Sequence, residues 1–380
     1  MDSKANLKRL NRSRILNAIR EYGQISKRRL QEITGLSWST ISMLTSELIE
    51  EGFLCVVSKQ NNFVGRRPEM IGVNPNNNVF IGIDVNCYDF RVIVTDLCGN
   101  ILRRNIFKDI PMERDIIIAR LFSAVDAIIK DCKPGSVRAI SFSVQGAVDS
   151  EGGESINIYY IKNWRNVQLK KMFSERYALP VFVFHDAFCA LKAEIFLEAA
   201  ARNSHSAIMI YYAPKIGISA PVVLDGNIYT GFGGRAGEIG LMIVPDGTGK
   251  DSCLLERVIT ESAVLHEYQQ HFPKTESFEE VAYAAQSGEK TARDIFELLG
   301  YHIGIAVANC VNLFDPELVL LGGMHVPYAE LYKERIITTI KKNIASNIRI
   351  LISEQDENYT AIGAALMAVE KVMDTFYWTD

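Results

Sequence analysis

The chain has 380 residues, of which 48% are apolar, and a formal net charge of −4. This length exceeds what one ordinary hydrophobic core holds, so two or three domains are expected. No stretch approaches about 18 uninterrupted apolar residues, and the first residues lack an apolar core, which argues against a membrane-spanning helix and a signal peptide. The seven cysteines are scattered and form no C-x-x-C pair, so we expect reduced thiols, a cytoplasmic protein and no membrane partner.

Charge is distributed unevenly along the chain. Residues 1–74 contain 12 Lys and Arg against 7 Asp and Glu, a net charge of +5. Because the whole chain carries −4, residues 75–380 carry −9. A basic head on an acidic body is typical of a DNA-binding head, whereas the alternative is a small helical bundle with solvated charges.

Residues 26–52 have the pattern of a helix-turn-helix. Ser26 stands before a run with Leu30 and Ile33 at helical spacing, and Gly35 closes that run. A second run has a serine at its start, a glycine at its end and helical apolar spacing between them: Ser37 or Ser39, then Ile41, Leu44, Leu48 and Ile49, then Gly52. An earlier helix over residues 12–22 would complete a three-helix core.

The second of these helices is the predicted recognition helix, and a wing follows it. Its first turns are rich in hydroxyls, which suit phosphates and base edges at a helix N-terminus. The candidate DNA contacts there are Ser37, Trp38, Ser39, Thr40, Ser42 and Met43. Residues 53–57 and 70–73 read as a β-hairpin wing, whose Arg66 and Arg67 are candidates for a minor groove. There is no Arg or Lys between Ser37 and Leu48, so base preference cannot be read from the common Arg–guanine pairing.

The rest of the chain has an α/β pattern that occurs twice. A turn-rich stretch at residues 74–78 divides a head, 1–74, from a body, 75–380. The first half of the body predicts strands over 79–85, 90–96, 101–107 and 137–144, with a helix over about 113–130. The second half predicts strands over 207–212, 216–224 and 318–321, and helices over 291–314, 328–343 and 361–373. Two similar strand-hairpin units suggest a duplicated body with a cleft between its halves; chance similarity is the alternative.

The order of several short motifs resembles the ROK family, named for repressors, open reading frames and sugar kinases. The motifs are Gly65-Arg-Arg-Pro, Gln145-Gly-Ala-Val-Asp, Asn163-Trp164, His185-Asp186, Gly237-Glu-Ile-Gly, residues 312–316 with Gly322-Gly323, and Ala361-Ile-Gly-Ala-Ala. The resemblance covers nearly the whole chain. It implies an N-terminal all-α winged helix-turn-helix and a duplicated actin-like, sugar-kinase-type (ribonuclease H-like) α/β body in a homodimer or tetramer. The two lobes would comprise about 79–190 with 360–380, and about 191–359.

Three features of the kinases in this family are missing. Their first phosphate loop is rich in glycine, but the matching stretch after Asp84 has none, and Pro214 removes a backbone donor from the second loop. Their zinc site needs a histidine at the position where this chain has Leu241. It also needs three cysteines, and the matching stretch of this chain contains only one, Cys253. We therefore expect no ATP phosphorylation, no metal and no cofactor.

The resemblance implies a partly retained sugar pocket. Asp186 matches the kinases' catalytic base, which in a repressor would only accept a hydrogen bond from a sugar hydroxyl. The implied sugar contacts are Gly146, Asn163, His185, Asp186, Glu238 and Glu256. Each has a simpler structural alternative, such as a helix cap for Asp186, a core histidine for His185 and a first-turn acid for Glu256. Phe188 and Leu241 would make the pocket more apolar, which favours a less polar ligand or means that no sugar binds.

Taken together, the residues and the resemblance predict a transcriptional regulator, most simply a repressor of carbohydrate genes. Its partners would be double-stranded operator DNA and a sugar or sugar derivative. Two alternatives stay open at this point: a sugar kinase with an appended DNA-binding head, and a regulator that responds to a protein partner rather than to a sugar.

Overall fold

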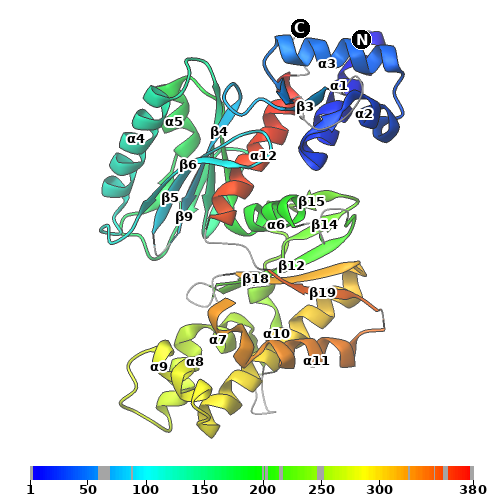
Figure 1. Ribbon diagram of the computed structural model, residues 1–380. Helices are drawn as coiled ribbons and strands as arrows, with labels where there is room; N and C mark the ends of the chain where they lie inside the picture. Colours follow the sequence, from blue (N-terminus) through cyan, green and yellow to red (C-terminus); the bar gives the residue numbers. More distant parts are fainter. Residues whose placement is uncertain are drawn as a thin grey trace. The chain divides into compact units, whose positions relative to one another are not determined.

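The structure is a computed structural model that describes residues 3–58, 69–86, 89–198, 201, 204–213, 217–245, 252–323, 326–345, 347–353 and 358–376. The chain divides into two compact units (Figure 1). The first comprises Met1–Ala193 and Asn358–Asp380, and the second Glu194–Glu357. The first unit contains both the N-terminal head and one α/β lobe.

The head consists of three helices and a small antiparallel sheet. The helices are α1 (Ser3–Tyr22), α2 (Lys27–Thr34) and α3 (Trp38–Glu50). The sheet has the order β1-β3-β2, with β1 (Ile25–Ser26), β2 (Leu54–Ser58) and β3 (Met70–Val73). Ser26 caps α2 by accepting a hydrogen bond from the Arg29 backbone N–H, and Ser37 caps α3 in the same way through Thr40. Gly35 ends α2 in the left-handed conformation, with φ of 68°. These contacts confirm the predicted helix-turn-helix.

The first helix is longer than predicted. It begins at Ser3 and not at Arg12, the start we inferred from the apolar pattern. Leu7 and Leu10 are exposed rather than packed in the core, so their apolar spacing gives no signal of a helix. The run has no Gly or Pro to end a helix, and Lys8 and Arg12 bind α3, which holds the first turns in place.

The lobe of the first unit is built on a five-stranded mixed sheet. Its order is β11-β7-β4-β5-β6, with β4 (Val79–Val85), β5 (Phe90–Thr95), β6 (Ile101–Phe107), β7 (Val137–Val144) and β11 (Val181–His185). Strands β4, β7 and β11 are parallel, and β4, β5 and β6 form an antiparallel meander. A second small sheet comprises β8 (Ala147–Asp149), β9 (Glu154–Asn157) and β10 (Arg165–Val167).

Helices α4 (Arg114–Asp131), α5 (Leu169–Tyr177) and α12 (Tyr359–Phe376) pack against this sheet, and α6 (Asp186–Leu197) follows β11 directly. Apolar residues of α4 and α5 share one core with the strands. Helix α12 approaches the sheet closely, because a Cβ on Gly82 of β4 would lie 2.2 Å from the Ala361 carbonyl oxygen. The Ser141 hydroxyl of β7 also donates to the Ala364 carbonyl at 2.8 Å.

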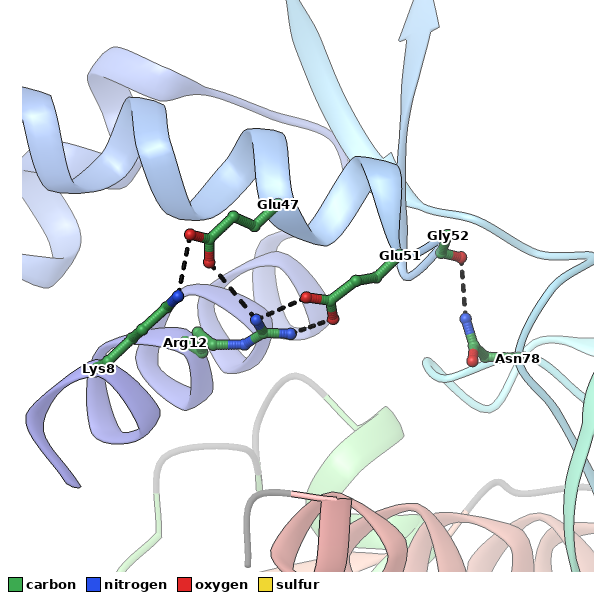
Figure 2. Close-up of polar contacts among 6 residues, drawn as sticks. All are labelled: Lys8, Arg12, Glu47, Glu51, Gly52 and Asn78. Atoms are coloured by element: carbon green, nitrogen blue, oxygen red, sulfur yellow. Dashed lines mark hydrogen bonds and ion pairs between the residues drawn. The ribbon is translucent and has the colours of Figure 1, made fainter. Parts of the chain in front are cut away.

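The head packs on this lobe through buried groups. Ile15, Leu16 and Ile19 of α1 belong to the same core cluster as Val369 and Val372 of α12. The Arg20 side chain, which is 7% exposed, donates to the Leu97 carbonyl at 2.8 Å. The Asn78 side chain donates to the Gly52 carbonyl just after α3, at 2.9 Å (Figure 2). The end of the recognition helix is thus tied directly to the start of the lobe.

The second unit repeats the strand order of the first. Its sheet runs β15-β14-β12-β18-β19, with β13 pairing β12. The strands are β12 (Ala207–Ala213), β13 (Gly217–Ser219), β14 (Val222–Leu224), β15 (Asn227–Tyr229), β18 (Leu318–Gly323) and β19 (Arg349–Ile352). As in the first unit, an antiparallel meander lies beside two further strands that run parallel to its first member. This shared order confirms the predicted duplication.

The remaining elements of the second unit are helical apart from one hairpin. They are the hairpin of β16 (Ile243–Pro245) and β17 (Ser252–Leu254), helices α7 (Glu256–Ile259), α8 (Glu261–Gln269), α9 (Phe278–Gln286), α10 (Lys290–Phe314) and α11 (Lys333–Asn343), and the 3-10 turns η1 (Ile239–Leu241) and η2 (Val326–Leu331). By length and composition α10 could cross a membrane, but 61% of its apolar window is buried inside the protein, as in a core helix.

Two predicted elements are interrupted in the structure. The strand expected over 216–224 is two strands, β13 and β14. Pro221 has no N–H for the ladder, and the Ala220 N–H donates instead to the Gly237 carbonyl at 2.7 Å. The helix expected over 328–343 is a 3-10 turn followed by α11, which starts only at Lys333.

Candidate DNA-binding and effector sites

Helix α3 presents the predicted DNA-contacting residues on its outer face. Ser37, Trp38, Ser39 and Met43 are exposed, and Thr40 and Ser42 are half-buried. The opposite face buries Ile41, Leu44, Thr45 and Leu48 in the head core. The Ser37 hydroxyl lies 2.9 Å from the Ser39 hydroxyl and 2.8 Å from that of Thr40, so the cap and the first turn form one hydroxyl cluster.

The two arginines predicted in the wing, Arg66 and Arg67, lie outside the described residues. The structure describes the strands of the wing, β2 and β3, which pair antiparallel. Val56 on β2 pairs Ile71 on β3, and Val56 is 45% exposed. The two paired strands of the predicted wing are therefore present, and β2 packs against α3.

Basic residues at the start of α2 were missed in the sequence reasoning. Lys27, Arg28 and Arg29 follow the Ser26 cap directly, and the side chains of Arg28 and Arg29 are 86% and 59% exposed. Both arginines lie near Glu32, with N–O distances of 3.7 and 2.9 Å. Cations in the first turn oppose the helix dipole, so they do not stabilise α2 by their position. The sequence signal for this site was the run of three consecutive cations directly after a helix cap. Such a run can bind DNA phosphates.

Charged side chains join α1 to the C-terminal half of α3 (Figure 2). The Lys8 ammonium donates to Glu47 at 3.0 Å, and the Arg12 guanidinium lies 3.6 Å from the same carboxylate. Arg12 also binds both carboxylate oxygens of Glu51, one of them at 2.8 Å. Only 14% of the Arg12 side chain is exposed, so this contact is better shielded from water than most surface ion pairs. It fixes the orientation of α3 against α1 and neutralises two acids on the recognition helix.

Three of the predicted sugar-contacting residues, Gly146, His185 and Asp186, follow or end parallel strands at the carboxyl edge of the sheet in the first unit. His185 ends β11 and pairs Val144 of β7, and Gly146 follows that strand by two residues. Ligands of open α/β sheets bind at this edge. Asp186 begins α6 and is only 4% exposed.

The His185–Asp186 pair has a defined geometry. The His185 Nδ1 atom lies 3.1 Å from one Asp186 carboxylate oxygen. The same oxygen accepts a hydrogen bond from the Ala187 N–H at 2.8 Å, in the first turn of α6. The His185 ring lies 5.8 Å from the Phe188 ring, which is buried. Both the predicted role of Asp186 and its simpler alternative as a cap are compatible with this arrangement.

Gly146 and Asn163 differ in how the structure places them. Gly146 has φ of 79°, and a Cβ there would lie 2.3 Å from the Asn157 carbonyl oxygen, so the position requires glycine. Asn163 is exposed, with a left-handed φ of 61°, in the turn before β10. Its neighbour Trp164 is buried and donates to the Ser155 hydroxyl at 2.7 Å. The conformation of Asn163 thus has a structural reason of its own, which is to turn the chain so that Trp164 enters the core.

The two predicted acids of the second unit lie on neighbouring segments, one in a turn and one at the start of a helix. Glu238 is exposed just before η1, and Glu256 begins α7, the first-turn position that was its structural alternative. A Cβ on Gly240 would lie 3.4 Å from the Glu256 carboxylate, which brings the two segments together. Gly237 has φ of 87°, and a Cβ there would lie 2.4 Å from the Ala220 carbonyl oxygen, so it fixes the start of the Glu238 turn. Leu241 is 57% exposed.

A buried ion cluster occupies the end of β4, next to the stretch that we matched by sequence to the first phosphate loop of ROK kinases. Asp84 and Arg91 are cross-strand partners on β4 and β5, and the Arg91 guanidinium lies 3.7 Å from Asp84 and 2.7 Å from Asp89. Asp84 also accepts hydrogen bonds from Ser143 at 2.7 Å and Asn86 at 2.8 Å. Burial raises the pKa of Asp84, while the Ser143 bond and the Arg91 charge act in the opposite direction. Asp84 is therefore held by local hydrogen bonds and by Arg91, and the Arg91 partner was missed because strand register had not been assigned.

Within the described part of the chain, no group of three or more His, Cys, Asp or Glu side chains could hold a metal ion. Cys253 is half-buried on β17. Residues 246–251, which precede it, and residues 214–216 of the second phosphate-loop stretch lie outside the described residues.

Two family models match the chain. The ROK family model matches residues 80–371, and a model of winged helix-turn-helix DNA-binding domains matches residues 9–54. The chain is 26% identical over 397 residues, 98% of each chain, to a putative xylose repressor from a Caldicellulosiruptor species. It is also 26% identical over 383 residues to the DNA-binding transcriptional dual regulator NagC of Escherichia coli, covering 94% of this chain and 92% of that protein.

Solved structures show the same fold. A ROK family transcriptional regulator, described as a homologue of the E. coli MLC protein, superposes with a TM-score of 0.79 at 23% identity over 98% of each chain. A ROK hexokinase from Thermus thermophilus superposes with a TM-score of 0.67 at 23% identity, over 78% of this chain and 99% of that one. The regulator includes a counterpart of the head, whereas the hexokinase matches about the length of the body.

Proposed function

Because this chain belongs to the ROK family and carries a winged helix-turn-helix head, we propose that it is a sugar-responsive, DNA-binding transcriptional repressor. The observation that carries the proposal is the recognition helix α3, which is capped, packed on one face and open with hydroxyl groups on the other. Relatives that align with this chain over almost their full length are named as sugar repressors. A kinase with an appended head is less well supported.

The body, in this proposal, senses a ligand and transfers no phosphate. Asp84 is held by Arg91, Ser143 and Asn86, so its carboxylate is already engaged. The stretch after it offers no glycine to let backbone amides approach a phosphate. A coupled ATPase assay with a panel of hexoses and pentoses tests this directly. ATP consumption that depends on any one sugar would overturn it.

We propose that the effector is a sugar or sugar derivative. The proposed contacts of the first unit are Gly146, Asn163, His185 and Asp186, and the candidate contacts of the second unit, considered by itself, are Glu238 and Glu256. The Asp186 carboxylate would accept hydrogen bonds from sugar hydroxyls, and His185 would hold it in place. A ligand can change DNA binding only through different affinities for the DNA-competent and DNA-free states. The sugars named in the relatives, xylose and N-acetylglucosamine, are the first to test.

Thermal melting against millimolar pentoses, hexoses and N-acetylhexosamines tests the effector site. A ligand at about 100 times its dissociation constant adds roughly 2.7 kcal/mol of stability, which gives a clear shift. We expect Asp186→Ala to abolish that shift and Glu175→Ala, at an exposed position on α5, to keep it. A ligand that still stabilises the Asp186→Ala protein would refute the assigned role of this carboxylate.

We propose that two heads of a dimer or tetramer bind a roughly palindromic operator, with Ser37, Trp38, Ser39, Thr40, Ser42 and Met43 at the major groove and Arg66 and Arg67 in the minor groove. Band-shift titrations on the upstream DNA of the protein's own gene should show a salt-sensitive specific complex. Arg67→Ala should weaken it, and unchanged affinity would remove the minor-groove role. Analytical ultracentrifugation of the free protein and the complex determines the number of subunits.

A further inference from the structure

The recognition helix exposes large apolar side chains where cations are common. Helix α3, Trp38–Glu50, contains no Lys or Arg. Ser39, Met43 and Ser46 follow one another at helical spacing on its exposed face, so Met43 stands in the middle of that face, between two hydroxyls. Met43 is 51% exposed and Trp38, in the first turn, is 53% exposed.

The chemistry of the major groove limits what such a face can recognise. The groove presents hydrogen-bond acceptors and donors at every base pair, but only thymine presents an apolar group, the 5-methyl. Serine hydroxyls donate or accept, so Ser39 and Ser46 fit several bases and discriminate weakly. The bidentate contact of Arg or Lys with guanine has no donor on this helix. Discrimination by direct contact of this helix with the major groove must therefore come mainly from its apolar side chains.

The helix is held firmly enough for such a contact to be selective. Its inner face packs in the head core, and its C-terminal half is tied to α1 through Glu47 and Glu51 (Figure 2). At the other end, the Ser37 hydroxyl cluster fixes the first turn beside Trp38. An apolar contact of one methyl group needs a fixed approach, since its energy depends on close packing.

We propose that Met43, assisted by Trp38, contacts thymine 5-methyl groups, so that methyl recognition determines the specificity of each operator half-site. This inference rests on the proposed function as a sequence-specific DNA-binding protein. In this inference Met43 and Trp38 determine specificity, and the feature that they recognise on the bases is the thymine 5-methyl group.

The test begins with the full-length protein and a random duplex library, from which bound sequences are selected and a consensus duplex is prepared. Each thymine of the consensus is then replaced in turn by uracil, which lacks only the 5-methyl group. We expect uracil at one or more positions of each half-site to weaken binding by about fourfold, the loss of one buried methyl. Fluorescence anisotropy at constant salt measures each affinity.

Variants assign the methyl contacts to the side chains. Met43→Ala should bind the thymine and uracil duplexes equally at the positions that Met43 reads, whereas Met43→Leu should keep the preference for thymine. Trp38→Ala should lose sensitivity at a neighbouring position only. Leu313→Ala, at a side chain 73% exposed in the second unit, serves as the control and should behave like the wild type. Thermal melting and affinity for a random duplex show that each variant is folded.

The outcomes separate this inference from the proposed function. A consensus whose affinity is unchanged by every uracil substitution overturns the methyl contacts but leaves sequence-specific binding intact. A Met43→Ala protein that keeps the full wild-type sensitivity to uracil overturns the role of Met43. A selection that enriches no sequence overturns the proposed function itself and this inference with it.

Discussion

Replacing Arg91 by methionine should destabilise the first unit strongly. The Arg91 guanidinium lies 2.7 Å from Asp89 and 3.7 Å from Asp84. The side chains of all three residues are nearly inaccessible, with 6% of Arg91, 6% of Asp89 and 3% of Asp84 exposed. Methionine keeps most of the volume but removes the only cation of this cluster among the described residues, which leaves two carboxylates buried side by side.

The magnitude follows from that burial. Removing one partner of a buried ion pair costs about 3–5 kcal/mol, because the remaining charge has lost its solvation and its partner. The hydrogen bonds from Ser143 and Asn86 to Asp84 remain and place the effect toward the lower end of that range. For a unit of this size, roughly 2–4 °C per kcal/mol gives a fall in melting temperature of about 6–20 °C.

Urea unfolding followed by circular dichroism measures this change, and pH gives an independent check. Burial raises the pKa of Asp84, and Arg91→Met removes the charge that acts against this rise, so in the variant the folded-state pKa of Asp84 lies further above its unfolded value. The protonated form of Asp84 fits the fold, so the deficit in stability is small at low pH and grows as pH rises through the raised pKa of this carboxyl. The deficit should therefore be larger at pH 8 than at pH 5.

A compensating variant decides whether charge is the cause. Arg91→Met combined with Asp84→Asn and Asp89→Asn removes all three charges and should recover much of the lost stability. The reasoning is refuted if Arg91→Met costs less than about 1 kcal/mol, a value typical of exposed pairs. It is equally refuted if the triple variant is no more stable than the single one.

Three further predictions concern the head, the effector site and the second unit. Arg12→Met should weaken DNA binding by about 1 kcal/mol, roughly fivefold, and Glu51→Gln in the same protein should partly restore it, as anisotropy titrations would show. Gly146→Ala should cost about 1–3 kcal/mol in urea unfolding and weaken the effector-induced thermal shift, because its Cβ would lie 2.3 Å from a carbonyl oxygen. His302 is buried, and burial lowers its pKa, so the unfolded chain takes up the proton first. Wild-type stability should fall as pH drops from about 6.5 through the lower folded value, and His302→Leu should remove that part of the fall.

Each of these has a contrary result. A Glu51→Gln change that fails to restore binding to Arg12→Met would mean that unneutralised charge is not the cause. Normal stability of Gly146→Ala would show that the loop moves freely at that point. Equal acid sensitivity of the wild type and His302→Leu would exclude this histidine as the group responsible.

The elements that depend on short-range chemistry were predictable from the sequence. The helix-turn-helix was found because Ser26, Gly35 and Ser37 act on backbone groups a few residues away. Strands β4, β6 and β7 were placed with their observed bounds as compact runs ending at turns, and in β4 every residue but Gly82 and Asp84 is apolar. The repeated hairpin pattern likewise indicated the duplicated body, because both units arrange the same succession of strands in the same order.

What depends on partners distant in sequence required the tertiary structure. The first turns of α1 are held in place by ion pairs of Lys8 with Glu47 and of Arg12 with Glu51. No pattern within α1 predicts these partners. In the sequence nothing distinguishes Arg91 from an ordinary strand residue. Only the register of β4 and β5 shows that it lies opposite Asp84. The sequence alone determined which residues cap helices, form turns and alternate along strands, since these features depend on interactions between residues close together in the chain. Only the fold decided which charges are buried together, because Coulomb and desolvation energies depend on neighbours and water exclusion that packing creates.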